Sequence, residues 1–267
     1  MLITGQNNPR VKKLIKLRDK KLRLELGVIL VEGLREMRLA LDSGLMLLEA
    51  YFPGSGPEAG KALEMVRDKA PSALTFHLEG RAFEKACVRG QAADVIGVFS
   101  TPEPSCLGDL SLGSSDLVIA LEGVEKPGNL GAVLRTADAV GARAVLVLSP
   151  QVDTWSPNVI RSSMGARFTV PVLESGFSEL AAWAEVSAVP VVLAMTGSPY
   201  DCYQTSMKGS RIIVMGSESD GLGERWSCSD YSKVWIPMRG SVDSLNLSVS
   251  TAILAYEWYR QQGFQPG

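Results

Sequence analysis

The sequence has few of the residues that build metal centres and disulfide frameworks. It contains one histidine, His77, and four scattered cysteines, Cys87, Cys106, Cys202 and Cys228. Structural zinc sites need Cys and His ligands at short, repeated spacing, so we expect no metal site. The cysteines are expected to be free thiols in a reducing compartment.

Long apolar runs are also missing from the sequence. A helix that crosses a bilayer needs about 20 mostly apolar residues, so we expect no membrane contact. We also expect no signal peptide before the basic start of the chain, and hence a cytoplasmic protein.

The chain has no overall excess of either charge, because 27 basic and 29 acidic residues give 27 − 29 = −2. The charge is unevenly placed, since residues 10–23 carry eight Lys and Arg residues and only one acidic residue, Asp19. The start signal at Asn8-Pro9 and the stop signal at Gly27 predict one amphipathic helix between them. Its basic face is either a solvated surface or a phosphate-binding surface, and so lopsided a charge favours phosphate. The candidate RNA contacts in it are Arg10, Lys12, Lys13, Lys16 and Lys20.

Short apolar runs alternate with helical patterns through the first hundred residues, which favours a small α/β domain with a largely parallel sheet. Strands are predicted at residues 28–31, 47–52, 74–78 and 95–99, and helices at 34–41, 58–70 and 81–88. Residues 101–115 are rich in Pro, Gly and Ser, which is typical of a linker. We therefore predict domains at 1–104 and 116–267, joined by a linker at 105–115.

The second half of the chain repeats the alternation and predicts another α/β sheet. Strands are predicted at residues 117–121, 144–148, 168–173, 191–195, 212–215 and 234–238, and helices near 130–140, after Ser156-Pro157, at 179–184 and from Leu245 onward.

Three short segments of this half combine strand ends, glycines and polar residues. They are residues 125–137 (EKPGNLGAVLRTA), 214–222 (VMGSESDGL) and 234–257, which contains IPM and SLNLSV. The glycines of the second segment lack the spacing of a dinucleotide fingerprint, and no Lys-Ser or Lys-Thr pair of a phosphate loop follows them. They still allow close backbone approach to a flat ligand, and open α/β sheets bind ligands at the carboxyl ends of their strands.

In this order, the three segments resemble the signatures of the SpoU-type RNA ribose 2′-O-methyltransferases of the SPOUT superfamily. The resemblance covers roughly residues 116–260. Residues 7–13 and 31–35 resemble, more loosely, the amino-terminal substrate-binding domain of the same enzymes. The resemblance implies an α/β, SPOUT-type trefoil-knotted catalytic domain, preceded by a small α/β RNA-binding domain. It also implies a homodimer whose sites lie at the interface, and S-adenosylmethionine (AdoMet) as the cofactor.

The resemblance also implies roles for individual residues. Arg135 becomes the leading catalytic residue, and the other positions matching the family's catalytic site are Asn129, Glu218, Ser244 and Asn246. The cofactor would lie against Met195, Thr196, Gly197, Gly216, Glu218, Ile236, Met238 and Leu245. Arg161 lies in a segment that resembles one facing the substrate, although a helix end is the alternative. Two residues depart from the family pattern, Lys126 and Ser219.

Two roles remain open for Arg135 in methyl transfer to a ribose 2′-oxygen. A guanidinium keeps its proton in proteins and is a poor general base, so Arg135 is either a base altered by a neighbouring phosphate or a group that positions the substrate. We favour positioning, with the proton passing to phosphate or water. The predicted activity is 2′-O-methylation of RNA, most of all ribosomal RNA. The alternatives are transfer RNA as the substrate and a non-catalytic RNA-binding protein built on this scaffold.

Overall fold

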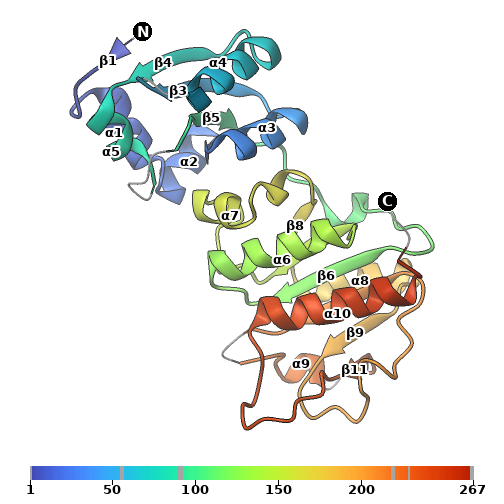
Figure 1. Ribbon diagram of the computed structural model, residues 1–267. Coiled ribbons are helices and arrows are strands. Elements are labelled where there is room, and N and C mark those ends of the chain that lie inside the picture. Colours follow the sequence, from blue (N-terminus) through green and yellow to red (C-terminus); the bar gives the residue numbers. More distant parts are fainter. Residues whose placement is uncertain (1, 55–56, 89–92, 218–219, 228, 265–267) are drawn as a thin grey trace. The chain divides into compact units, whose positions relative to one another are not determined.

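The computed structural model describes residues 2–54, 57–88, 93–217, 220–227 and 229–264 (Figure 1). The chain forms two compact units. Unit 1 comprises Met1–Glu103 and Trp155–Thr169, and unit 2 comprises Pro104–Thr154 and Val170–Gly267. The chain therefore enters unit 1 twice. The domain limits expected at 104 and 115 stay a prediction.

Unit 1 is built on a five-stranded sheet in the order β1-β4-β3-β5-β2. The strands are β1 (Leu2–Ile3), β2 (Val28–Glu32), β3 (Leu47–Pro53), β4 (Leu74–Leu78) and β5 (Ile96–Ser100). The expectation of a largely parallel sheet is wrong, because β5 runs antiparallel to both β2 and β3. All five residues of β2 and four of the five in β5 are buried. Strands buried on both faces bury the same side chains in either direction, so the apolar pattern does not encode strand direction.

Helices cover both faces of the unit 1 sheet (Figure 1). On one face lie α1 (Pro9–Lys16) and α5 (Gly80–Ala86), which bury Val11, Leu14 and Phe83 against the sheet. On the other face lie α3 (Leu34–Asp42), α4 (Pro57–Lys69) and α7 (Pro157–Ser162), and the last of these adds Ile160 to the core. The later segment of the chain is thus part of the unit 1 core.

The basic segment forms two helices and not the single helix that was predicted. Helix α1 begins after Asn8, whose side chain accepts a hydrogen bond from the Arg10 N–H at 2.9 Å. Helix α2 (Lys20–Leu26) begins after Asp19, whose carboxylate accepts from the Lys21 N–H at 2.7 Å. An Asp side chain satisfies the free N–H groups of a new helix better than those of a continuing one, so Asp19 divides the segment. Gly27 ends α2 at a φ of 61°, as expected.

Unit 2 is built on a six-stranded sheet in the order β11-β9-β10-β6-β7-β8, and its recorded strand pairs are all parallel. The strands are β6 (Leu117–Glu122), β7 (Ala144–Leu148), β8 (Val172–Ser175), β9 (Val191–Ala194), β10 (Arg211–Met215) and β11 (Ser232–Val234). Two predicted strands were too long by several residues. The one predicted from Phe168 begins at Val172, because Ala166–Phe168 forms a 3₁₀ turn, and the one predicted to Met238 ends at Val234. The α/β class is confirmed.

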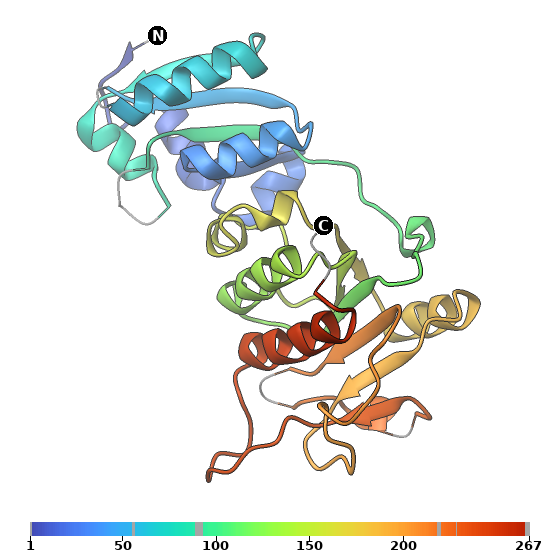
Figure 2. The ribbon, with the colours of Figure 1, turned by 45° about the vertical axis from the view of Figure 1, so that its right-hand side comes forward.

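Helices α6 (Pro127–Ala139) and α10 (Leu247–Gln261) lie side by side on one face of this sheet (Figures 1 and 2). The other face is covered by α8 (Phe177–Val186) and the short α9 (Glu224–Ser227), which bury Leu180, Ala184 and Trp226. The expected linker supplies Leu107, which is buried in the same core. Helices α6 and α10, whose starts carry the predicted site residues Asn129 and Asn246, therefore lie on the same face of the unit 2 sheet.

Candidate active site

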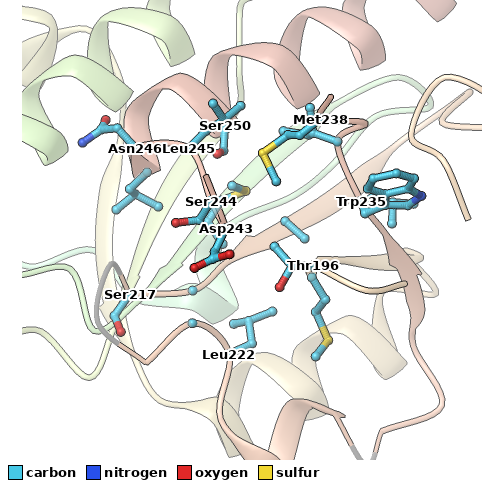
Figure 3. Close-up of a pocket in the computed structure, with 18 of the residues that line it drawn as sticks. Thr196, Ser217, Leu222, Trp235, Met238, Asp243, Ser244, Leu245, Asn246 and Ser250 are labelled. Atoms are coloured by element: carbon cyan, nitrogen blue, oxygen red, sulfur yellow. The ribbon is translucent and has the colours of Figure 1, made fainter. Parts of the chain in front are cut away.

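The carboxyl ends of three neighbouring parallel strands of unit 2 border one cavity of about 570 Å³. Met195 and Thr196 follow β9, Gly216 follows β10, and Ile236 comes two residues after β11. The loop before α10 closes the cavity, as Figure 3 shows. A volume of this size is typical of sites for small ligands, and its place in the sheet is the one expected for an open α/β fold.

The turn after β10 requires glycine at position 216. Ser217 and Gly221 exchange two backbone N–H···O bonds of 3.1 Å, which fold the loop back over the strand end. A Cβ on Gly216 would lie 2.2 Å from the carbonyl carbon of Gly221 and 2.4 Å from the nitrogen of Leu222. Backbone atoms cannot yield to such contacts, so the cavity wall depends on the absence of a side chain there. Glu218 and Ser219 lie outside the described residues.

Asn246 links the first and the third of the sequence segments. It caps α10, where its Oδ1 accepts from the Ser248 N–H at 2.9 Å and from the Ser248 hydroxyl at 2.7 Å. Its Nδ2 donates to Asn129 Oδ1 at 3.4 Å. Segments 117 residues apart in sequence therefore meet at the starts of two packed helices.

Helices α10 and α6 both begin at residues other than those predicted from the sequence. Helix α10 begins at Leu247 and not at Leu245, because Asn246 has a non-helical backbone and acts as the cap. Asn129 does not lie in a loop before α6. It is the third residue of that helix, whose first residue is Pro127. Proline is favoured at this position, because the missing N–H would have no partner inside the helix.

Arg135 is exposed on α6. It is not part of the buried face of α6, which consists of Leu130, Gly131, Val133, Leu134 and Ala137. Among the residues that the structure describes, Arg135 has no hydrogen-bond or ion-pair partner. Its guanidinium is thus available for a partner outside the chain, and phosphate accepts its paired N–H groups well.

Most of the residues predicted to hold the cofactor border the one cavity. Met195, Thr196, Gly216, Ile236, Met238 and Leu245 line it, together with the predicted catalytic residues Ser244 and Asn246. Gly197, Asn129 and Arg135 are not among its lining residues, and Glu218 cannot be placed.

Sequence reasoning missed several lining residues, among them Met215, Leu222, Trp235, Asp243 and Ser250. Three of these adjoin residues that were predicted: Met215 precedes Gly216, Trp235 precedes Ile236 and Asp243 precedes Ser244. Proximity to a strand end could have identified Met215 and Trp235. Ser250 lies on α10, and no pattern in the sequence marks it.

The basic residues of unit 1 divide into bound and exposed groups. Arg10 and Lys13 form ion pairs with Glu49 at 3.5 and 3.1 Å. Arg18 donates to the carbonyls of Lys85, Ala86 and Cys87, and the buried Arg23 donates to those of Leu17 and Arg18. Within residues 10–23, the four exposed lysines are Lys12, Lys16, Lys20 and Lys21. These lysines, and not the whole cluster, present their charges to solvent.

Arg161 lies in the last turn of α7, in unit 1, near two acidic side chains. Burial raises the pKa of Glu32, although a hydrogen bond from the Val88 N–H (2.6 Å) and the charge of Arg161 lower it in part. Burial likewise raises the pKa of Glu36. The charge of Arg161 thus acts on Glu32 and Glu36 within unit 1, and its contact with RNA stays a prediction.

No helix in the described part of the chain has both the length and the apolarity to cross a membrane. The described residues also contain no group of three or more His, Cys, Asp or Glu side chains that could hold a metal ion.

Comparisons with known proteins match both units. Residues 116–256 match the model of the SpoU rRNA methylase family, and residues 8–97 match that of the MRM3-like substrate binding domain. A 23S rRNA (uridine(2479)-2′-O)-methyltransferase from Streptomyces viridochromogenes is 27% identical over 247 residues, which are 90% of this chain and 85% of that protein.

Two solved structures are similar over nearly the whole chain. The crystal structure of an RNA 2′-O ribose methyltransferase is 36% identical, with a TM-score of 0.86, and the match covers 98% of this chain and 99% of that one. The AdoMet-bound rRNA methyltransferase from Sinorhizobium meliloti is 27% identical, with a TM-score of 0.87 and 97% of each chain covered.

Proposed function

The chain belongs to the SpoU rRNA methylase family, and we propose that it methylates the 2′-oxygen of a ribose in 23S ribosomal RNA, with AdoMet as the methyl donor. The observation that carries the proposal is the cavity at the ends of β9, β10 and β11, which Ser244, Leu245 and Asn246 close from the start of α10. The names of similar enzymes, which act on 23S rRNA, support this choice of RNA. We also propose that the protein acts in the cytoplasm.

The residues around the cavity fit AdoMet. Met195, Met215, Leu222, Ile236 and Met238 supply apolar surface for a flat adenine ring. The tight turn at Gly216 brings backbone N–H and C=O groups close to that space, where they can bind a heterocycle through hydrogen bonds. We propose that Gly216, Ile236, Met238 and Leu245 hold the cofactor, together with Met195, Thr196 and Glu218.

The bound cofactor supplies a methyl group on a positively charged sulfur, and the protein has to bring a ribose hydroxyl in line with it. Such positioning requires the reacting atoms to be about 3–3.5 Å apart. We propose that Arg135 binds a phosphate of the RNA beside the target ribose, and that Asn129, Ser244 and Asn246 orient the nucleotide. An exposed guanidinium keeps its proton in proteins and suits phosphate binding better than proton abstraction, so the hydroxyl proton passes to phosphate or water.

We further propose a homodimer and a trefoil-knotted unit 2. Val249 and Tyr256 on α10 are 46% and 47% exposed in the single chain, and Ile253 between them is half-buried. Large apolar side chains in a row on a helix favour burial against a partner. A second copy seated there would also bring its own residues close to Arg135, because α6 and α10 are packed together.

Calorimetric titration of the purified protein with AdoMet in the presence of a chelator tests the cofactor site. We expect one binding event per chain. The variant Ser250→Trp, which fills the cavity from α10, should lose this heat while its circular dichroism stays unchanged. Unaltered AdoMet binding by the folded variant would place the cofactor elsewhere.

The RNA is tested by incubating the protein with AdoMet and either ribosomal or transfer RNA. We expect methyl incorporation into ribosomal RNA. Incorporation into transfer RNA alone would establish the alternative substrate, and incorporation into neither RNA, despite cofactor binding, would support a non-catalytic RNA-binding protein.

A further inference from the structure

The charged side chains among the described lining residues of the unit 2 cavity are all of one sign. Asp220 and Asp243 contribute carboxylates to it, and none of the described lining residues is Lys, Arg or His. Arg239 lies in the same loop as Asp243 but does not line the cavity. A cavity with this lining attracts cationic ligands more strongly than neutral ligands of the same shape.

Of the two carboxylates, that of Asp243 is available to a ligand. The side chain belongs to the loop between β11 and α10, is exposed, and has no hydrogen-bond or ion-pair partner among the described residues. In the view of Figure 3 its oxygens lie in the middle of the cavity, between the side chains of Ser217 and Thr196. Asp220, in contrast, already interacts with other groups of the protein, and its N–H donates to Ser217 Oγ at 3.1 Å.

The methyl donor and its product differ in charge at one atom. AdoMet has a sulfonium, an ammonium and a carboxylate, which give a net charge of +1. During transfer the bond between sulfur and the methyl carbon breaks, and its electron pair stays on sulfur. A bond from the ribose oxygen to that carbon forms, and the hydroxyl proton is released. S-adenosylhomocysteine is therefore neutral overall.

We propose that Asp243 is a specificity-determining residue that selects the sulfonium form of the cofactor over S-adenosylhomocysteine. The proposal rests on the proposed occupancy of this cavity by AdoMet. The carboxylate of Asp243 would attract the sulfonium of AdoMet. Methyl transfer removes this positive charge, so S-adenosylhomocysteine is held less tightly and is replaced more easily by a new molecule of AdoMet. Asp243 thus weakens product inhibition without taking part in proton transfer.

The test compares the dissociation constants of AdoMet, S-adenosylhomocysteine and sinefungin for the wild-type protein and the variant Asp243→Asn. Sinefungin has an amine, which is protonated, in place of the sulfonium methyl. We expect the variant to bind AdoMet and sinefungin about three- to fivefold more weakly, the upper part of the range for one exposed charge interaction. Its affinity for S-adenosylhomocysteine should stay within a factor of two. Asp243→Glu, which keeps the charge, should restore much of the preference.

Equal weakening of all three ligands would overturn the proposal, because it would mean that Asp243 contacts a group that donor and product share. An unchanged ratio of affinities would overturn it as well. The matched control is Glu185→Gln on α8, which removes one exposed charge from unit 2 away from the cavity, and it should change none of the three constants.

The role of Asp243 can also be tested on the wild-type protein alone. Added salt screens an exposed charge interaction, so the preference for AdoMet over S-adenosylhomocysteine should fall as the salt concentration rises from about 50 mM to about 500 mM. A preference independent of salt would contradict the role of Asp243. Failure of the proposed cavity itself is recognised separately, since Ser250→Trp would then still bind both ligands.

Discussion

Beside Gly216, the backbone of Gly221 and Leu222 comes so close that a single methyl group has no room. The loop before α10 contributes to the site through the side chain of Asn246, which caps α10 and donates a hydrogen bond to Asn129. Arg135 instead stands exposed on α6. At the scale of residues, the site thus combines Gly216, where no side chain fits, Asn246, which hydrogen bonds hold in place, and Arg135, whose guanidinium is available to RNA.

The variant Gly216→Ala should weaken AdoMet binding at least tenfold, because the loop has to move to admit the methyl group. Forced packing of this kind also costs about 1–3 kcal/mol of the free energy of unfolding. Calorimetry and thermal unfolding measure the two effects. Gly176→Ala is the control for cofactor binding and should keep the wild-type AdoMet affinity, because a methyl group added there would meet no atom within 4 Å. AdoMet affinity at the wild-type level in Gly216→Ala would refute the proposed cofactor loop.

The variant Arg135→Ala should lose methyl transfer by a factor of about 100 or more while its AdoMet affinity stays within a few-fold. The reason is that Arg135 does not line the cavity, and a group that acts mainly in the transition state affects turnover and spares cofactor binding. Turnover with saturating ribosomal RNA and calorimetry with AdoMet give the two numbers. A wild-type turnover rate would remove Arg135 from the mechanism.

At the scale of elements, the basic residues of α1 and α2 divide into those that bind other parts of unit 1 and those that are exposed to solvent. The ion pairs of Arg10 and Lys13 with Glu49 connect α1 to β3, and Arg10 also lies 3.9 Å from the centre of the Phe76 ring on β4. The remaining lysines point to solvent. The sequence predicted the basic surface but could not separate these groups, because Glu49 lies 36 residues beyond Lys13 and the pairing depends on the tertiary fold.

The variant Lys12→Ala, Lys16→Ala, Lys20→Ala and Lys21→Ala should bind RNA with a weaker dependence on salt. If all four lysines contact phosphates, counterion release predicts that the slope of log affinity on log salt flattens by about 3, at ~0.7 per contact with single strands. Filter binding at several salt concentrations gives the slope. The matched variant with Lys61, Arg67 and Lys69 of α4 changed to Ala should leave the slope unaltered. An unchanged slope in the α1–α2 variant would mean that these lysines are only a solvated surface.

The variant Glu49→Gln should lose stability at neutral pH and not at acidic pH. Burial acts to raise the pKa of Glu49, but hydrogen bonds from Tyr51 and Lys13, with the charges of Lys13 and Arg10, lower it below its ordinary value of 4.5. A lowered pKa contributes stability above the unfolded value, and this is lost as the pH falls through the folded value. We expect a loss of about 1 kcal/mol at neutral pH. Denaturant unfolding at about pH 7 and about pH 3 measures it, and an equal loss at both values would argue against the ion pairs.

At the scale of the whole molecule, the sequence predicted most elements but not how the chain distributes them. The strand at Leu74–Leu78 has the predicted limits, since its apolar residues lie between clear turn signals. The grouping of Trp155–Thr169 with unit 1 was not predicted, because the burial of Ile160 against β2 and α3 depends on contacts far away in sequence. Asp243 escaped notice for a similar reason, as its position in the cavity follows from the fold of the loop after β11.

The central claim is that this chain methylates a ribose 2′-oxygen of ribosomal RNA with AdoMet. Its most direct test is to incubate purified protein with 23S ribosomal RNA and AdoMet carrying a labelled methyl group, and then to map the product by resistance to alkaline cleavage. A 2′-O-methyl group removes the hydroxyl that attacks the neighbouring phosphate, so the account predicts labelled RNA with one protected linkage, and no label with Arg135→Ala. Label on a base, with every linkage still cleaved by alkali, would contradict the account.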